Sequence, residues 1–363
     1  MLGRLANVRS VSGAMICAGL LAAGGARALT QEEILNYKGA DRDQVLLDGA
    51  KKEGEVVFYA SVIVNQALRP IAEGFMKKYP SIKMGYWRAD APELIAKITA
   101  ESRARNIVAD VIEGTGMAEL AIAGGLVQPY QTPVTSEYPP QYRDPRNMWT
   151  STRLSYFSLA YSTKNVAPAD IPKTYDDLLD PKWQGRLAWR VGSVTGTELF
   201  ITNLRMAWGE EKAMAYFRKL AGQKMINFGS GSARTLVDRV MAGEFPLALN
   251  IFAHHPLISA QKGAPVNSQL MDPVPSSPST MAVMKDLRHP HAAMLLVDFV
   301  LSKEGQGIMA KAEYFPSRPD VPALPHLQAV VPLKAGVPEN FISPENMLKY
   351  AEGSNKIYQD LFR

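Results

Sequence analysis

The sequence has very little cysteine, with a single residue, Cys17, in a chain of 363. One cysteine cannot form an internal disulfide, so a disulfide-stabilised scaffold is excluded. Runs of like charge are also missing, because 40 Lys and Arg are interspersed with 35 Asp and Glu. The chain therefore carries no sequence signature of nucleic-acid or membrane-surface binding. Hydrophobic residues make up 47% of the chain, which excludes disorder, and the length suggests two domains.

Signatures of common catalytic sites are missing as well. The sequence contains no phosphate-binding loop of the form G-x-x-x-x-G-K-[ST], no G-x-S-x-G nucleophile elbow and no H-E-x-x-H zinc motif. Gly114-Thr115-Gly116 begins like a dinucleotide-binding loop, but Glu119 stands where the third glycine should be. This pattern favours a turn between a strand and a helix. We therefore expect neither an enzyme nor a bound cofactor.

The first 28 residues have the pattern of a secretory signal peptide. They contain three arginines and no acid, and an uncharged stretch at 10–26 ends in Ala26-Arg27-Ala28. This stretch is shorter than the roughly 20 apolar residues of a membrane-spanning helix. Its removal would leave 37 Lys and Arg against 35 Asp and Glu, a net charge of +2 in place of +5. We therefore expect a nearly neutral protein exported to the periplasm.

Hydrophobic periodicity predicts two blocks of alternating strands and helices. In the first, strands are expected at 56–59, at 82–87 and at 107–112, with helices between them. Asp90 with Glu93, and Thr195 with Glu198 in the second block, have the spacing of capping boxes. The second block, after residue 186, has the same order of elements. The predicted fold class is α/β, with two lobes, each a mainly parallel sheet flanked by helices.

Five histidines are the remaining candidates for metal binding: His254, His255, His289, His291 and His326. Neighbouring residues of an extended chain point to opposite faces, so His254 and His255 are not expected to bind one metal ion together. His289 and His291 begin a predicted helix, where polar residues are common. No further ligands stand at a recognisable spacing, and we predict no metal site.

Small polar residues follow the predicted strands of both blocks. In parallel α/β sheets, ligands bind beyond the carboxyl ends of the strands, where helix amino ends offer free N–H groups. Each Ser or Thr could also be an ordinary helix cap, but such loops in two lobes together indicate a cleft for a polar ligand. The two lobes would be joined by a hinge, with crossings near 155–161 and 272–278.

Several segments resemble, in order, the periplasmic solute-binding proteins of ATP-binding-cassette importers. They include EGEVVFYAS, ADVIEG, PKTYDDLLDPKWQGRL, MAGEFPLAL and EYFPSRPDV. The most similar branch binds ferric iron, thiamine or phosphonates. The resemblance implies a type II binding-protein fold, a cleft that closes on a ligand, and delivery to an inner-membrane permease with its ATPase. Lobe 1 would then comprise 29–157 and 275–322, and lobe 2 would comprise 158–274 and 323–363.

The ligand does not follow from the resemblance. Ferric-iron members carry two adjacent tyrosines in the region that reads NIFAHHP here. Without phenolate or carboxylate oxygens a trivalent cation lacks its preferred donors. We therefore predict a small organic anion, such as a phosphonate, phosphate ester or carboxylate. Ferric iron and a cationic ligand remain alternatives, the latter using Asp90, Glu113 and Glu198, and an exported hydrolase using His254 is a remote one.

Arginine side chains match carboxylate and phosphate groups, so Arg190 and Arg234 are the main candidates for ligand contacts. We expect a monomer that binds this solute between its lobes. The predicted ligand-binding residues are Ser61, Arg88, Thr115, Arg190, Ser193, Thr195, Thr197, Ser230, Ser232, Arg234, Phe252 and His254.

Overall fold

The computed structural model describes residues 28–229 and 231–363. The predicted signal peptide lies outside the described residues except for Ala28, and so does Ser230. Across these two ranges, none of the helices has the length and apolar character needed to cross a membrane.

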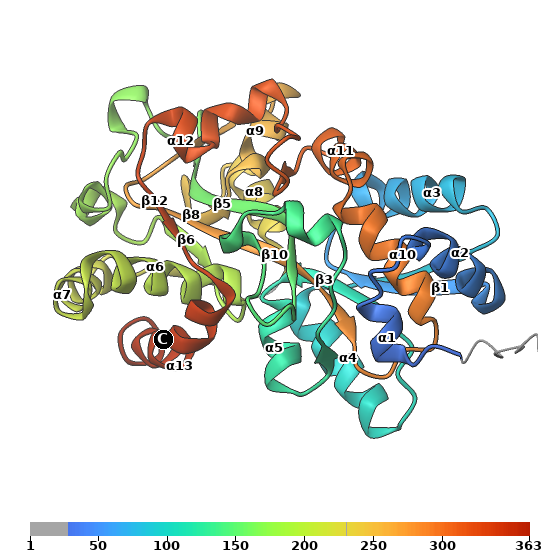
Figure 1. The fold of residues 1–363 in the computed structure, drawn as a ribbon. Helices are drawn as coiled ribbons and strands as arrows, with labels where there is room; N and C mark the ends of the chain where they lie inside the picture. The colour runs from blue at the N-terminus through green and yellow to red at the C-terminus, as the bar shows by residue number, and fades with distance from the viewer. Residues whose placement is uncertain (1–27, 230) are drawn as a thin grey trace, which may run out of the picture.

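A mixed sheet of twelve strands runs through the centre of the described chain (Figure 1). Eight strands lie side by side in the order β2, β1, β3, β10, β5, β8, β6, β7. Their bounds are β1 (Glu55–Ala60), β2 (Lys83–Arg88), β3 (Val111–Thr115), β5 (Thr150–Ser162), β6 (Leu187–Arg190), β7 (Ile226–Phe228), β8 (Leu247–Phe252) and β10 (Val274–Met284). The short strands β4 (Val127–Gln128) and β12 (Glu339–Phe341) pair with β10, and β9 (Val266–Gln269) and β11 (Phe315–Pro316) pair with β5.

The first half of the sheet is built on the parallel strands β1, β2 and β3. Alternate residues of β1 face opposite sides, so both faces need a cover. Phe58 is buried in one core cluster with residues of α2 (Arg42–Glu53), α3 (Arg69–Lys78) and α10 (Pro290–Leu301). Tyr59 is buried in another, with residues of α4 (Ala91–Arg103) and α5 (Met117–Ala123). Shorter helical segments of this half are α1 (Gln31–Leu35), η1 (Val64–Leu68) and α11 (Lys303–Lys311).

The second half is built on β6, β7 and β8, in which β6 is parallel to both neighbours. Trp189 packs in a cluster with residues of α6 (Leu199–Trp208), α7 (Glu210–Ala221) and α13 (Pro344–Leu361). Ala188, on the opposite face, packs with residues of α8 (Ala233–Ala242). Helix α9 (His254–Gln261) follows β8. Helices thus cover both faces of both halves, which confirms the predicted α/β class.

The long strand β5 joins the two halves. Its residues up to Tyr156 pair with β10, and those from Phe157 onward pair with β8. Strand β10 pairs with β5 on one side and with β3 on the other, antiparallel in both cases. The two segments predicted as crossings fall in β5 and around the start of β10. The lobe boundaries themselves stay a prediction.

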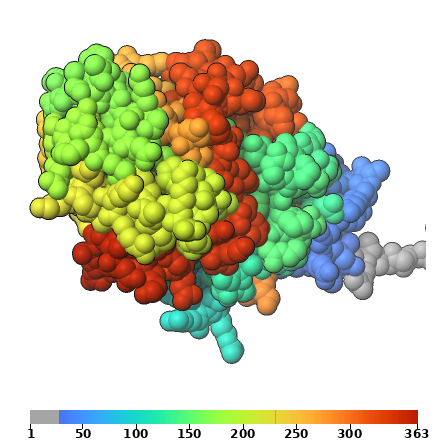
Figure 2. Space-filling view, turned by 90° about the vertical axis from the view of Figure 1, so that its left-hand side faces the viewer, coloured from blue at the N-terminus to red at the C-terminus, as the bar shows by residue number. Residues whose placement is uncertain are grey.

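The C-terminal segment runs along the outside of this junction. Figure 2 shows it in red between the green and yellow residues of the second half and the green-blue residues of the first. It contains η8 (Pro325–Val330), α12 (Pro332–Ala335), β12 and α13. Helix α13 contacts α6 and η7 (Val194–Glu198) of the second half and α5 of the first. Residues far apart in the sequence are therefore packed against one helix.

The prediction of the third strand was wrong in its position. The strand was expected at 107–112 but begins only at Val111 and ends at Thr115. Ile107 is buried although it precedes the strand, so its apolar character reflects packing on the core and not pairing. The later position places Gly114 and Thr115 in the strand, and Gly116, the residue before helix α5, has a positive φ of 75°.

Candidate functional site

A cavity of about 440 Å³ lies between the two halves of the sheet. Its wall forms where strands end and helices begin, as expected for a ligand site in parallel α/β sheets. Ser61 follows β1, and Arg88 and Thr115 end β2 and β3. Arg190 and Phe252 end β6 and β8 in the second half. The cavity therefore receives side chains from both halves.

Ten of the twelve residues predicted for the site line this cavity: Ser61, Arg88, Thr115, Arg190, Ser193, Thr195, Ser232, Arg234, Phe252 and His254. Thr197 is buried in η7 but is not part of the wall, because successive residues of a helical turn face different directions. Ser230 lies outside the described residues. The role of the ten residues in binding a ligand stays a prediction.

Arg190 is a buried cation, with 9% of its surface exposed. Its Nη2 donates hydrogen bonds to the hydroxyls of Ser193 and Thr195, the latter at 2.7 Å. Among the described residues, none of the ion pairs within 4 Å includes Arg190, and burial lowers the pKa of its guanidinium. Burying a charge without an opposite charge is unfavourable. The hydroxyls are neutral, and the carboxylate that acts on this charge, Asp90, lies more than 4 Å away and is itself paired with Arg88.

The turn after Arg190 is shaped by a close backbone contact. Gly196 has non-helical angles, φ −98° and ψ −124°, and a Cβ there would lie 2.0 Å from the Arg190 carbonyl oxygen. Asn250 Nδ2 donates to the carbonyls of Thr195 and Gly196, each at 3.0 Å. The predicted capping box at Thr195 was wrong, because Ser193 caps this turn and the Thr195 hydroxyl accepts a hydrogen bond from Arg190.

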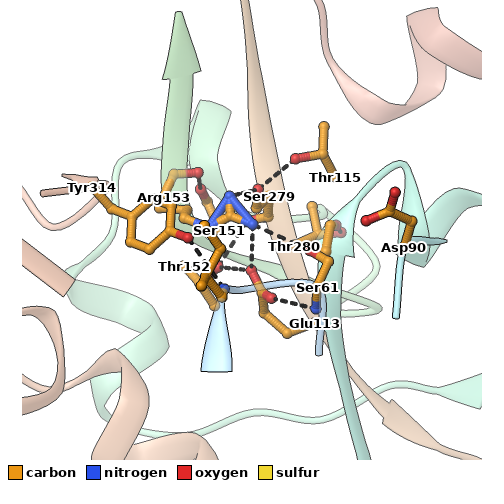
Figure 3. A network of polar contacts seen from close by, with 12 residues as sticks. Ser61, Asp90, Glu113, Thr115, Ser151, Thr152, Arg153, Ser279, Thr280 and Tyr314 are labelled. Atoms are coloured by element: carbon orange, nitrogen blue, oxygen red, sulfur yellow. Dashed lines mark hydrogen bonds and ion pairs between the residues drawn. The ribbon is translucent and has the colours of Figure 1, made fainter. Parts of the chain in front are cut away.

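Arg153 lines the same cavity and was missed by the sequence analysis. Figure 3 shows its guanidinium at the centre of a polar network. Its Nη1 donates to Ser279 Oγ at 2.5 Å and its Nη2 to Ser61 Oγ at 3.2 Å, and the Tyr314 ring centre is 4.9 Å away. Arg153 is the single charged residue of β5. A lone charge in a completely buried strand was the signal that could have found it.

Glu113 pairs with Arg153 beneath the cavity. Its side chain is fully buried, with Oε1 3.4 Å from Arg153 Nη2. Oε1 also accepts a hydrogen bond from the Thr152 hydroxyl at 3.0 Å, and Oε2 accepts from the Ser61 N–H at 3.4 Å. The carboxylate is thus held by the loop after β1 and by β5, and it balances the charge of Arg153.

The other two arginines of the cavity also have carboxylate partners. Arg88 Nη2 lies 3.1 Å from Asp90 Oδ1, and Arg234 Nε lies 3.1 Å from Asp238 Oδ1. Asp90 precedes α4 but makes no side-chain hydrogen bond to it, so the predicted capping box with Glu93 was wrong. Its carboxylate is directed to Arg88 instead.

The three acidic residues that could bind a cationic ligand already have partners within the protein. Asp90 and Glu113 pair with arginines. Glu198 does not line the cavity, and its Oε2 accepts a hydrogen bond from Asn355 at 3.1 Å. Burial raises the pKa of Glu198 to about 7. These contacts weaken the case for a cationic ligand.

His254 and His255 lie differently from the expectation. They begin helix α9, and their ring centres are 4.4 Å apart, so the assumption of an extended backbone was wrong. Both line the cavity beside Phe252 and Tyr314. Burial lowers the pKa of His255 to about 3 and that of His254 well below its usual range, so both are neutral near pH 7.

The geometry of His254 does not match a hydrolase. Within residues 28–229 and 231–363, neither of its ring nitrogens has a hydrogen-bond partner. A serine nucleophile needs a histidine within hydrogen-bond reach and a group that orients the ring. This arrangement is not formed around His254 in the described part of the chain.

His289 and His291 serve separate structural contacts. His289 Nδ1 lies 2.9 Å from Asp110, and His291 Nδ1 lies 2.6 Å from Glu53. Across the described residues, no three His, Cys, Asp or Glu side chains come together in a way that could hold a metal ion.

Comparisons with known proteins agree with this architecture. A family model described as bacterial extracellular solute-binding protein matches residues 106–343. The iron uptake protein A1 of Synechocystis sp. is 26% identical over 299 residues, which cover 78% of this chain and 81% of the relative. Iron-bound HitA from Pseudomonas aeruginosa superimposes with a TM-score of 0.70 at 22% identity, covering 85% of this chain and 99% of that one.

A second solved structure of the same fold holds a different ligand. The periplasmic binding protein AfuA from Actinobacillus pleuropneumoniae, with fructose-6-phosphate bound, superimposes with a TM-score of 0.69 at 23% identity. The match covers 85% of this chain and 98% of that one. Such two-lobed binding proteins share the fold of this chain, and at this level of identity the likeness extends to the fold alone.

Proposed function

Because this chain belongs to the family of bacterial extracellular solute-binding proteins, we propose that it is the binding subunit of an ATP-binding-cassette importer. It captures a small solute in the cavity between the two halves of its sheet. Closure of the halves around the solute then presents it to a membrane permease, which works with a cytoplasmic ATPase. A ligand favours the closed state when it contacts both halves, and both halves supply cavity-lining side chains.

The proposed solute is an organic anion, and the single observation that carries this proposal is the environment of Arg190. Its guanidinium is buried, no carboxylate of the described residues lies within 4 Å of it, and Asp90 acts on it only from farther away. An anionic group in the cavity would supply the missing charge and accept its hydrogen bonds. Ser193 and Thr195 add hydroxyls beside it, and Arg153 lies on the wall contributed by β5. Carboxylates, phosphonates and phosphate esters have the required oxygen atoms.

Ferric iron is the second candidate, and the names of the similar proteins support it better than they support an organic anion. The relative from Synechocystis is named for iron uptake, and the HitA structure is described as iron-bound. The donor set of this cavity argues against a bare ferric ion, because arginines dominate its charged residues. Iron carried as an anionic chelate, such as ferric citrate, would satisfy both observations.

A thermal-unfolding panel on the mature protein separates these candidates. It contains carboxylates, phosphonates, phosphate esters, citrate, ferric citrate, a ferric salt, thiamine and a polyamine. A ligand present at 100 times its Kd stabilises the protein by about 2.7 kcal/mol. We expect stabilisation by at least one organic anion, and its loss when Arg190 and Arg234 are both replaced by glutamine.

The alternatives predict other outcomes. Stabilisation by ferric citrate alone, with citrate inactive, would establish the iron candidate. Stabilisation by thiamine or the polyamine alone would refute an anion site. An unchanged response of the double arginine variant would show that the anion binds elsewhere.

A further inference from the structure

The charges around the cavity nearly cancel. Four arginines line it: Arg88, Arg153, Arg190 and Arg234. Three are paired with carboxylates, which are Asp90 at 3.1 Å, Glu113 at 3.4 Å and Asp238 at 3.1 Å. The two histidines of the wall are neutral, because burial lowers the pKa of each. These four cations and three carboxylates leave a net charge of +1, and Arg190 is the cation without a carboxylate within 4 Å in the described part of the chain.

Glu113 differs from the other two carboxylates in its burial. The side chains of Asp90 and Asp238 are each 50% exposed, so water and salt weaken their effect on a ligand. The side chain of Glu113 is 0% exposed and is held by hydrogen bonds from Ser61 and Thr152. A charge in such surroundings acts through a lower effective dielectric constant and over a longer range.

Glu113 is connected to the cavity through the residues that it contacts. Arg153 and Ser61, which it contacts, both line the cavity wall. Figure 3 shows Glu113 and Thr115, from the same strand, on either side of the Arg153 guanidinium network. An anion bound to Arg153 would therefore share this cation with Glu113 and be repelled by its carboxylate.

We infer that Glu113 is a specificity-determining residue. Because its carboxylate neutralises Arg153, the site keeps a net charge of only +1 and so favours singly charged organic anions over doubly charged ones. Monocarboxylates and sulfate esters belong to the favoured class, and phosphate monoesters belong to the other. This inference rests on the proposed function and specifies the charge of its substrate.

The affinities of the Glu113→Gln variant for ligands of different charge can be predicted. Coulomb energy is proportional to the charge of the ligand, so Glu113 repels a doubly charged ligand twice as strongly as a singly charged one. If removal of this charge raises the affinity for the monoanion by some factor, the affinity for the matched dianion must rise by the square of that factor. Glutamine keeps the shape of the side chain and a carbonyl oxygen for hydrogen bonding.

The test uses ligand pairs that differ in charge but hardly in shape. Glucose 6-sulfate and n-propyl sulfate carry one negative charge, whereas glucose 6-phosphate and n-propyl phosphate carry nearly two at pH 8. Their dissociation constants are measured by isothermal titration calorimetry on wild-type protein and on Glu113→Gln. The preference for phosphate over sulfate should rise on the order of tenfold in the variant. An unchanged preference would overturn the inference.

Two further variants control for folding and for net charge. Glu244→Gln removes an exposed carboxylate that pairs with Arg239 2.8 Å away, and the preference should stay as in wild type. Asp238→Asn frees Arg234 at an exposed pair and should shift the preference toward phosphate by a smaller factor. If Glu113→Gln does not fold, the wild-type protein decides, because tighter binding of a phosphate ester than of its matched sulfate ester would overturn the inference.

The outcomes also separate this inference from the proposed function. Wild-type protein that binds the esters with a preference untouched by the variants would overturn the inference alone. Wild-type protein that binds none of the four esters nor any organic anion of the panel, but binds ferric salts, would overturn both.

Discussion

Replacing Arg190 with glutamine should abolish most of the response to ligand while leaving the fold intact. Arg190 is 9% exposed and donates to the hydroxyls of Ser193 and Thr195. The substitution removes two hydrogen bonds to neutral hydroxyls, which lowers the stability of the unliganded protein. It also removes a buried charge, which raises that stability, so the two effects oppose each other. We expect the melting temperature of the unliganded protein to change by no more than about 2 °C.

The effect on binding is larger because the contact to an anion is charge-assisted. A hydrogen bond between charged groups contributes about 1.5–3 kcal/mol, so loss of one strong contact weakens binding by roughly 100-fold. A ligand at 100 times its wild-type Kd stabilises the wild type by about 2.7 kcal/mol and the variant by only about 0.4 kcal/mol. For a chain of this length these values correspond to shifts of about 4 °C and below about 1 °C.

Differential scanning fluorimetry with the most active anion of the panel measures both shifts. The matched control is Arg239→Gln, which removes an exposed arginine paired with Glu244 at 2.8 Å. The control should retain the full 4 °C shift, since surface ion pairs contribute little and Arg239 does not line the cavity. A full shift in Arg190→Gln, or an equal loss in both variants, would refute the role given to Arg190.

Two further predictions concern stability. Gly196→Ala places a Cβ 2.0 Å from the Arg190 carbonyl oxygen, so it should lower the free energy of unfolding by about 1–3 kcal/mol. It should also weaken the response to ligand, and an unaltered urea midpoint would contradict this prediction. Burial raises the pKa of Glu119 from 4.5 to about 7, and neither carboxylate oxygen has a hydrogen-bond partner among the described residues. The contribution of protonated Glu119 is complete below pH 4.5 and is lost as the pH rises through 7, because ionisation then favours the unfolded chain. Relative to Glu119→Gln, the wild type should therefore lose about 3 kcal/mol of unfolding free energy between pH 4.5 and 8 in urea unfolding. A constant difference would show that folding does not raise the pKa of Glu119.

The strands and helix caps near the site show which features local sequence patterns can predict. Strand β1 was predictable, because a run of β-branched and aromatic residues favours a strand over a few neighbouring positions. The two capping boxes failed, since the side chains of Asp90 and Thr195 have stronger partners in Arg88 and Arg190. A competing arginine nearby in the chain can therefore override a local cap.

Arg153 illustrates what lay beyond local patterns. Its partners Ser61 and Ser279 are 92 and 126 residues away in the sequence. No periodicity or motif links such positions, because they meet only through the pairing of β10 with β3 and β5. The histidine pair failed for a related reason, since the residues after β8 turn into a helix that brings both rings onto one wall.

The sequence by itself determined the α/β class, and it pointed to Arg190 and Arg234, which both line the cavity. These features depend on short-range preferences and on the general rule that parallel strands end at a shared edge. Only the tertiary structure decided which charges remain free in the cavity. Three of its four arginines are neutralised by carboxylates, and Arg190 alone lacks such a partner among the described residues. That balance depends on distances of 3 to 4 Å between side chains, which folding of the whole chain establishes.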